Sequence, residues 1–264
     1  MHAGIALPLV LLGALYTAGL LRLRRRAPSA VRTSQVACFA AGFATLVVAL
    51  GPPLHELSEQ LFTAHMIQHE LLMVVAAPLL VLARPGPVLL WAFSRANRRR
   101  IGAAVRSPIV RGPWSVATRP FDAWLLHGIV IWVWHIPMFF QATLHNDLVH
   151  AAQHVSFLGS ALLFWWSITH GMRRAARGMS IVYLFTTVVH TGVLGALMAF
   201  AHAPWYPDYA AGAARWGLTA LADQQLGGLV MWVPASATYL VAALAIMRVW
   251  LRDSEWVVSE AQRA

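Results

Sequence analysis

Lysine is absent from this 264-residue chain, cysteine occurs once, and charged residues of all kinds make up only 11% of it. The shortage of charge excludes a soluble domain, because 59% of the residues are hydrophobic and one core of this size could not bury them. The net charge of +10 comes from arginine alone, and nearly all arginines lie in short loops between apolar runs. This arrangement is typical of an integral membrane protein and argues against nucleic-acid binding.

The single cysteine, Cys38, lies within an apolar run. One thiol excludes an internal disulfide, a Cys-x-x-Cys pair and a thiolate metal cluster. The chain also shows no nucleotide-binding motif and no nucleophile triad, so we predict no catalytic residue and no enzyme. A metal site in this chain would have to use His, Met, Asp or Glu.

Seven apolar stretches are long enough to cross a bilayer, which takes about 20 helical residues. They run approximately over Ala3 to Leu21, Gln35 to Gly51, Thr63 to Ala83, Phe121 to Thr143, Val149 to His170, Met179 to Ala201 and Gln225 to Trp250. We therefore predict an all-α fold, an integral membrane bundle of seven transmembrane helices that forms a single domain over residues 1–264.

Arginines follow the first, third, fifth and seventh of these stretches. The four groups are Arg22 to Arg32, Arg84 to Arg119, Arg173 to Arg177, and Arg248 to Arg263, and only Arg215 lies elsewhere. By the positive-inside rule all four groups are cytoplasmic. We therefore expect the N-terminus and the loop of about residues 202–224 outside, and the C-terminus in the cytoplasm.

Two loops are expected to touch the membrane surface. The basic cytoplasmic loop of about residues 84–119 should lie on anionic lipid headgroups, with an interfacial helix around Val88 to Arg100. The outer loop should lie on the opposite surface, because amphipathic aromatic side chains anchor at membrane interfaces. Its aromatic residues are Trp205, Tyr206, Tyr209 and Trp216.

Two predicted spans begin with the same pattern, His-x-x-Gln-His. It covers His65 to His69 in the third span and His150 to His154 in the fifth, with Gln68 and Gln153 at equivalent positions. Both helices run from outside to inside, so the two motifs lie at matching depth. Residues four apart on a helix are neighbours, so each pair can offer two imidazoles to one ion or one each to two ions.

These motifs lead to a predicted metal site near the outer face. The ligands that we predict are His65, His69, His150, His154, His135 and His190. The side chains expected to orient these ligands or balance their charge are Gln68, Gln153, Glu70 and Asp223. His55 and His145 fall in predicted outer loops, where they could either join the site or be solvated.

Other polar and sulfur-containing residues have a simpler interpretation. His127 and His170, on the cytoplasmic half, are expected to form hydrogen bonds between helices. Five methionines could be soft ligands for cuprous ion, although methionine in an apolar span more often serves packing. They are Met66, Met73, Met138, Met198 and Met231.

Five segments together resemble a known family. They are Gly51 to Leu54, His65 to His69 with Ala77 to Leu80, Trp134 to Pro137, His150 to His154, and Asp223 to Trp232. Over roughly Gln35 to Arg248 the chain resembles the polytopic CtaG family of cytochrome c oxidase assembly factors. The resemblance implies a multi-pass protein of the bacterial plasma membrane that helps to mature a haem–copper oxidase. The implied metal is copper, which imidazole ligands suit, and the implied partner is the oxidase core subunit.

Three alternatives remain open at this point. A membrane metalloenzyme with a dinuclear iron or copper centre would also use several His-x-x-x-His pairs. A b-type haem protein could use His190 together with His69 or His135. A metal-free assembly scaffold would leave the histidine pairs dispensable. The oligomeric state and the client oxidase do not follow from the sequence.

Overall fold

The computed structural model describes residues 3–170 and 177–261, with side chains described for residues 6–170 and 178–252. Every regular element in those two stretches is helical, which confirms the all-α prediction. Three of the arginines used to predict the topology, Arg173, Arg174 and Arg263, lie outside the described residues.

Six helical segments of the described chain are long and apolar enough to cross a membrane. They are α1 (Ala3–Arg26), α2 (Thr33–Leu50), the composite segment Phe62–Ala83, α11 (Asp147–His170), α12 (Arg177–Ala199) and α14 (Ala220–Ala261). A short 3₁₀ turn, η1 (Pro28–Ala30), joins α1 to α2. The protein is therefore a multi-pass membrane protein.

A seventh span is present only as a broken helix. The predicted continuous helix is divided into α9 (Pro120–Trp134) and α10 (Pro137–His145), which meet at an angle of 71°. Pro137 cannot donate the next helical hydrogen bond, and it forces Ile136 into an extended conformation with φ −63° and ψ 126°. The break leaves His135 at the end of α9, with its side chain buried.

The third span contains a π-helical segment. It consists of α4 (Phe62–Glu70), the π-helical η2 (Leu71–Ala76) and α5 (Ala77–Ala83). The wider turn begins just after His69, and the Met73 carbonyl within it accepts a hydrogen bond from Trp165 Nε1 at 3.0 Å. Such segments occur often at functional sites, and this one begins two residues after the first histidine motif.

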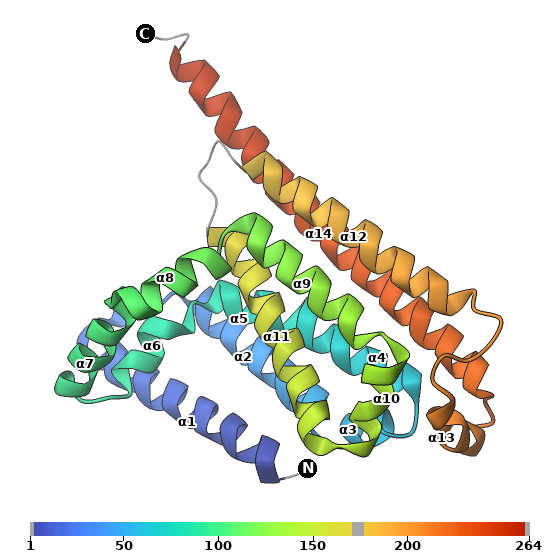
Figure 1. Cartoon of the computed structure of the whole chain (residues 1–264). Helices are drawn as coiled ribbons and strands as arrows, with labels where there is room; N and C mark the ends of the chain where they lie inside the picture. The colour runs from blue at the N-terminus through green and yellow to red at the C-terminus, as the bar shows by residue number, and fades with distance from the viewer. Residues whose placement is uncertain (1–2, 171–176, 262–264) are drawn as a thin grey trace.

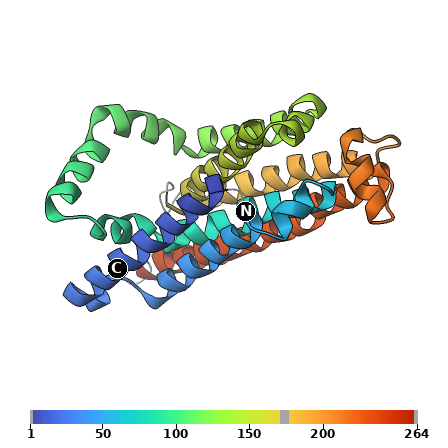
Figure 2. The same cartoon turned by 90° about the horizontal axis from the view of Figure 1, so that it is seen from below.

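Three short helices join α5 to α9 at one end of the bundle. They are α6 (Pro85–Trp91), α7 (Arg95–Arg106) and α8 (Pro108–Ala117), and we call them the strap. Of these, α6 packs on α1, while α7 and α8 stand away from the other helices (Figure 2). The single interfacial helix expected around Val88 to Arg100 is thus two helices. Ser94 separates them, because its side chain accepts the Asn97 N–H at 3.3 Å and caps α7.

The opposite end of the bundle holds the remaining short elements. They are α3 (Leu54–Ser58), α10, η4 (Pro207–Tyr209) and α13 (Ala210–Arg215). The start of α1 lies at this same end, whereas the far end of α14 extends beyond the end that carries α6 to α8 (Figure 1). The residue types divide accordingly, with the basic strap at one end and the paired histidine motifs toward the other.

Candidate metal centre

Six histidines meet between α3, α4, the α9–α10 break and α11. They are His55, His65, His69, His135, His150 and His154, and we call them the histidine cluster. All six side chains are buried. Neighbouring ring centroids lie between 4.3 and 6.5 Å apart. The cluster forms where side chains of α4 and α11 meet, as His65 and Gln153 do, near the end of the bundle that carries α3 and α10 (Figure 1).

The tightest part of the cluster combines both His-x-x-Gln-His motifs. One ring nitrogen each from His65, His150 and His154 lies within 4.8 Å of the other two. An ion bound at about 2.0–2.1 Å holds three nitrogens about 3.3–3.5 Å apart, so side-chain movements of roughly 1 Å would complete such a site. The three imidazoles are therefore suited to hold one metal ion.

His69 and His135 extend the cluster inward from this group. The His69 ring lies 5.5 Å from that of His154 and 6.5 Å from that of His135. His135 Nδ1 lies 2.7 Å from the Ile131 carbonyl, which can only accept, so Nδ1 carries the proton and Nε2 carries a lone pair. This tautomer leaves Nε2 free to bind a metal ion.

Several buried nitrogens of the cluster lack a hydrogen-bond partner among the described residues. They are Nε2 of His135, Nε2 of His154 and both ring nitrogens of His69. An unsatisfied buried polar group is costly, and native proteins rarely keep several together without a reason. A metal ion would use one lone pair from each of these rings, so the donors present fit the group that the sequence implies.

Tyr209, in η4, contacts the cluster from the outer loop. Its hydroxyl lies 3.0 Å from His65 Nδ1 and 3.1 Å from the Ser58 carbonyl. Burial raises the pKa of the Tyr209 phenol well above its usual value, and Asp223 acts in the same direction, so the hydroxyl keeps its proton. When it donates to Ser58, its oxygen can accept the His65 Nδ1 proton, which leaves the Nε2 lone pair available to an ion.

The prediction that the aromatic residues of the outer loop lie on the membrane surface was wrong for two of them. Tyr206 and Tyr209 are buried, although Trp216 is exposed. Tyr206 donates a hydrogen bond to the His135 carbonyl at 2.8 Å, at the break between α9 and α10. No pattern in the sequence separates these tyrosines from surface anchors, because their partners lie on distant helices.

The two motif glutamines hold different parts of the cluster. Gln153 Oε1 lies 3.1 Å from His65 Nε2, so this amide must turn aside if an ion binds at that nitrogen. Gln68 donates to the Ala49 carbonyl and also lies 3.3 Å from His55 Nδ1. Gln68 thus contacts His55, which is buried with its ring 5.5 Å from that of His150.

Asp223 contacts no histidine of the cluster but holds the helix that carries two of them. Its carboxylate accepts the Phe62 N–H at 2.6 Å and the Thr63 N–H at 3.0 Å, and it also accepts from the Thr63 hydroxyl at 2.6 Å. It therefore caps the N-terminus of α4 from the first turn of α14.

Glu70 points away from the cluster, toward α14. It lines a cavity of about 250 Å³ together with residues that include Val230, Pro234 and Thr238. No cluster histidine is among the lining residues. Glu70 directly follows His69 in the sequence, and successive side chains of a helix point to different sides.

The structure separates three other histidines from the cluster. His190, a predicted ligand, lies on α12, where its Nδ1 accepts a hydrogen bond from Trp132 Nε1 at 3.4 Å. His127 Nδ1 lies 3.0 Å from Ser160 Oγ, and His170 Nε2 accepts from Arg84 Nε at 2.7 Å. The prediction of a bond between helices is confirmed for His127, whereas His170 bonds to Arg84 at the junction of α5 and α6.

Comparisons with known proteins agree with the segments that suggested a family. The sequence model described as "cytochrome c oxidase caa3 assembly factor" (Caa3_CtaG) matches residues 14–253. Uncharacterized proteins of Mycobacterium bovis and Mycobacterium tuberculosis are each 25% identical over 259 residues, which are 94% of this chain and 38% of theirs. One from Mycobacterium leprae is 25% identical over 275 residues, covering 96% of this chain and 40% of its own.

The chain thus spans about two fifths of the length of these relatives. No solved structure matches it. The family match covers all the helices that form the histidine cluster. On that match, the chain belongs to the Caa3_CtaG family of cytochrome c oxidase assembly factors.

Proposed function

We propose that this assembly factor binds copper through its histidine cluster and delivers it to the core subunit of a haem–copper oxidase. Family membership supports the assembly role. The copper assignment rests on three ring nitrogens that lie within 4.8 Å of one another, one each from His65, His150 and His154. Imidazole suits copper, and a delivery role requires no catalytic residue.

The arginine distribution supports a location and an orientation. The basic strap α6 to α8 would face the cytoplasm of a bacterium, and the histidine cluster would lie near the outer face of its plasma membrane. The N-terminus would then be outside and the C-terminus inside. Copper would reach the cluster from the extracytoplasmic side.

The arrangement of the six imidazoles suits delivery better than permanent storage. Three histidines can hold one ion and leave a coordination position open to an incoming ligand. Neighbouring rings no more than 6.5 Å apart offer further ligands, so the ion can exchange one imidazole at a time. Tyr209 orients His65 during such exchange.

Copper retention tests the proposal. Purified protein is loaded with cuprous ion under reducing conditions and washed, and the copper is counted by elemental analysis. We expect at least a tenfold loss of affinity when His150 and His154 are both replaced by alanine, because two of the three closest donors are removed. The matched control is His202→Ala, which removes an exposed histidine.

Three outcomes would count against this proposal. Equal copper retention in the double variant would make the cluster dispensable, as a metal-free scaffold requires. Iron with an intense optical band in the protein as purified would indicate haem, and iron without it would indicate a dinuclear enzyme. Normal oxidase copper content in cells carrying the double variant would contradict delivery, provided that size-exclusion profiles show the variant to be folded.

Tyr209→Phe is expected to weaken copper binding by about tenfold without removing a ligand, because His65 loses the group that orients its imidazole. Competition with a chromophoric cuprous chelator measures this affinity. Tyr239→Phe is the matched control, since it removes an equally buried hydroxyl from a tyrosine of α14 whose ring packs on Trp165 and not on the cluster. Equal affinities in the two variants would show that Tyr209 does not act through His65.

A further inference from the structure

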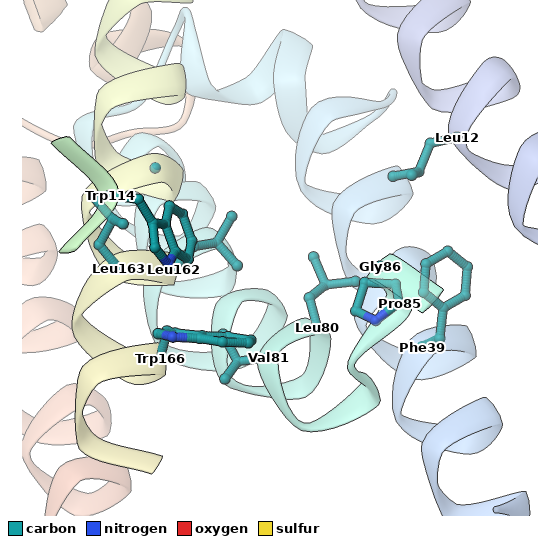
Figure 3. A pocket seen from close by; sticks show the side chains of 11 residues that line it. Leu12, Phe39, Leu80, Val81, Pro85, Gly86, Trp114, Leu162, Leu163 and Trp166 are labelled. Carbon is teal, nitrogen blue, oxygen red and sulfur yellow. The ribbon is translucent and has the colours of Figure 1, made fainter. Parts of the chain in front are cut away.

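An apolar groove opens between α1 and α11 on the half of the bundle that carries the arginines. Its volume is about 580 Å³. Phe39 and Leu12 line one side, and Trp114, Leu162 and Trp166 line the other, as Figure 3 shows. Every residue that lines the groove is apolar, glycine or proline. A cavity of this kind, facing the lipid, is suited to a hydrocarbon chain.

A cationic pocket lies next to this groove. Its volume is about 550 Å³, and its polar lining includes Arg32, Arg84, Thr169 and His170. Residues of α11 line both cavities one turn apart, Trp166 in the groove and His170 in the pocket. A hydrocarbon chain in the groove against Trp166 would therefore place its polar end close to the pocket.

Contacts between side chains join the two cavities. The Trp166 ring lines the groove and stacks on the ring of His170 in the pocket, with centroids 4.4 Å apart. His170 in turn accepts a hydrogen bond from Arg84 Nε at 2.7 Å. This contact uses only one edge of the guanidinium, so its terminal nitrogens remain available to an anion.

The charge of the pocket has no counter-charge within the described chain. Arg84 stands between α5 and α6 with φ 49°, a left-handed conformation that is uncommon for a residue other than glycine. The ion pairs found among the described residues join His55 to Glu59 and His145 to Asp208, and neither involves Arg32 or Arg84. The pocket is thus positively charged and open to a negatively charged group.

We propose that the groove and the pocket together bind one anionic phospholipid of the cytoplasmic leaflet. The phosphate lies between Arg32 and Arg84, and an acyl chain lies in the groove against Trp166. The cytoplasmic leaflet is rich in anionic lipids, which match the charge of this end of the protein. Arg–phosphate contacts are short and charge-assisted, and the two guanidinium groups repel the ammonium of a zwitterionic headgroup, so an anionic headgroup is favoured.

The lining argues against a helix of a partner protein or of a second copy. The apolar groove is joined to a pocket that holds Arg32 and Arg84, through the stacked rings of Trp166 and His170. An apolar helix would leave both guanidinium groups without an anion, whereas a lipid pairs an acyl chain with an anionic headgroup.

Lipid retention after purification tests this site. The protein is equilibrated with mixed micelles containing equal amounts of phosphatidylglycerol and phosphatidylcholine with the same acyl chains, and bound lipid is counted by native mass spectrometry. We expect one retained phosphatidylglycerol, favoured several-fold over phosphatidylcholine. Gly159→Leu should reduce retention at least fivefold, because Gly159 lines the groove and a Cβ there meets open space.

Matched variants separate the two parts of the site. Gly112→Leu adds the same side chain at another open position, outside the groove, and should retain lipid like the natural chain. Arg84→Gln with Arg32→Gln should abolish the preference for phosphatidylglycerol and leave the groove able to hold a neutral lipid. Equal retention in the two leucine variants, no preference in the natural chain, or a protein dimer that disappears with Gly159→Leu would each overturn the proposal.

Discussion

Replacement of Asp223 by alanine is expected to destabilise the protein by about 3–5 kcal/mol, which would lower its melting temperature in detergent by roughly 10 °C. The carboxylate is fully buried and accepts the backbone N–H groups of Phe62 and Thr63. Alanine would leave both donors unsatisfied at a buried helix start, and hydrogen bonds to a charged acceptor are worth about 1.5–3 kcal/mol each.

The melting temperature is measured by heating the protein and counting what remains folded by size-exclusion chromatography. Asp208→Ala is the matched control, because Asp208 is an exposed carboxylate paired with the exposed His145 and should cost less than about 1 kcal/mol. The melting temperature of Asp223→Asn should lie between those of the two alanine variants, since asparagine keeps one accepting oxygen. A melting temperature for Asp223→Ala equal to that of the control would contradict the capping role.

Gly212→Ala is expected to cost about 3 kcal/mol or more and to displace α13 from the loop before α4. A Cβ at this position would lie 2.0 Å from the Gln60 carbonyl oxygen and 2.8 Å from its carbon. These are backbone atoms, so no side chain can rotate to relieve the overlap. Because Tyr209 directly precedes α13, the displacement should also remove the hydroxyl from His65.

Gly112→Ala provides the comparison, because nothing lies within 4 Å of a Cβ there and both glycines are in helices. Its melting temperature should stay within about 2 °C of the natural protein. Cuprous-ion affinity should fall for Gly212→Ala by as much as for Tyr209→Phe. If Gly212→Ala unfolded at the natural temperature, the close packing of α13 on the loop would be refuted.

The outer loop shows why part of the site could not be found from the sequence. Tyr206 and Tyr209 were predicted as surface anchors, since aromatic residues in a short loop beside a span usually serve that role. Their hydroxyls instead contact the His135 carbonyl and His65 Nδ1, which belong to other helices. Loop composition carries no information about such distant partners.

The polar residues beside the ligands show the same limit. Glu70 and Asp223 were predicted to serve the histidines because they lie at a similar depth in the sequence pattern. The depth of a residue along a helix axis does not determine which neighbouring helix its side chain faces. Glu70 faces α14, and Asp223 caps α4, so neither touches an imidazole of the cluster.

The sequence by itself determined the membrane class, the approximate position of the helical spans and the two matched histidine motifs. These features are local, because span length follows from hydropathy and the facing of residues four apart follows from helix periodicity. Only the tertiary structure decided that His55 joins the cluster, that His190 stands beside Trp132, and that the fourth span is broken beside His135. Those outcomes depend on how each helix is rotated against its neighbours, and that rotation is set by packing among residues far apart in the chain.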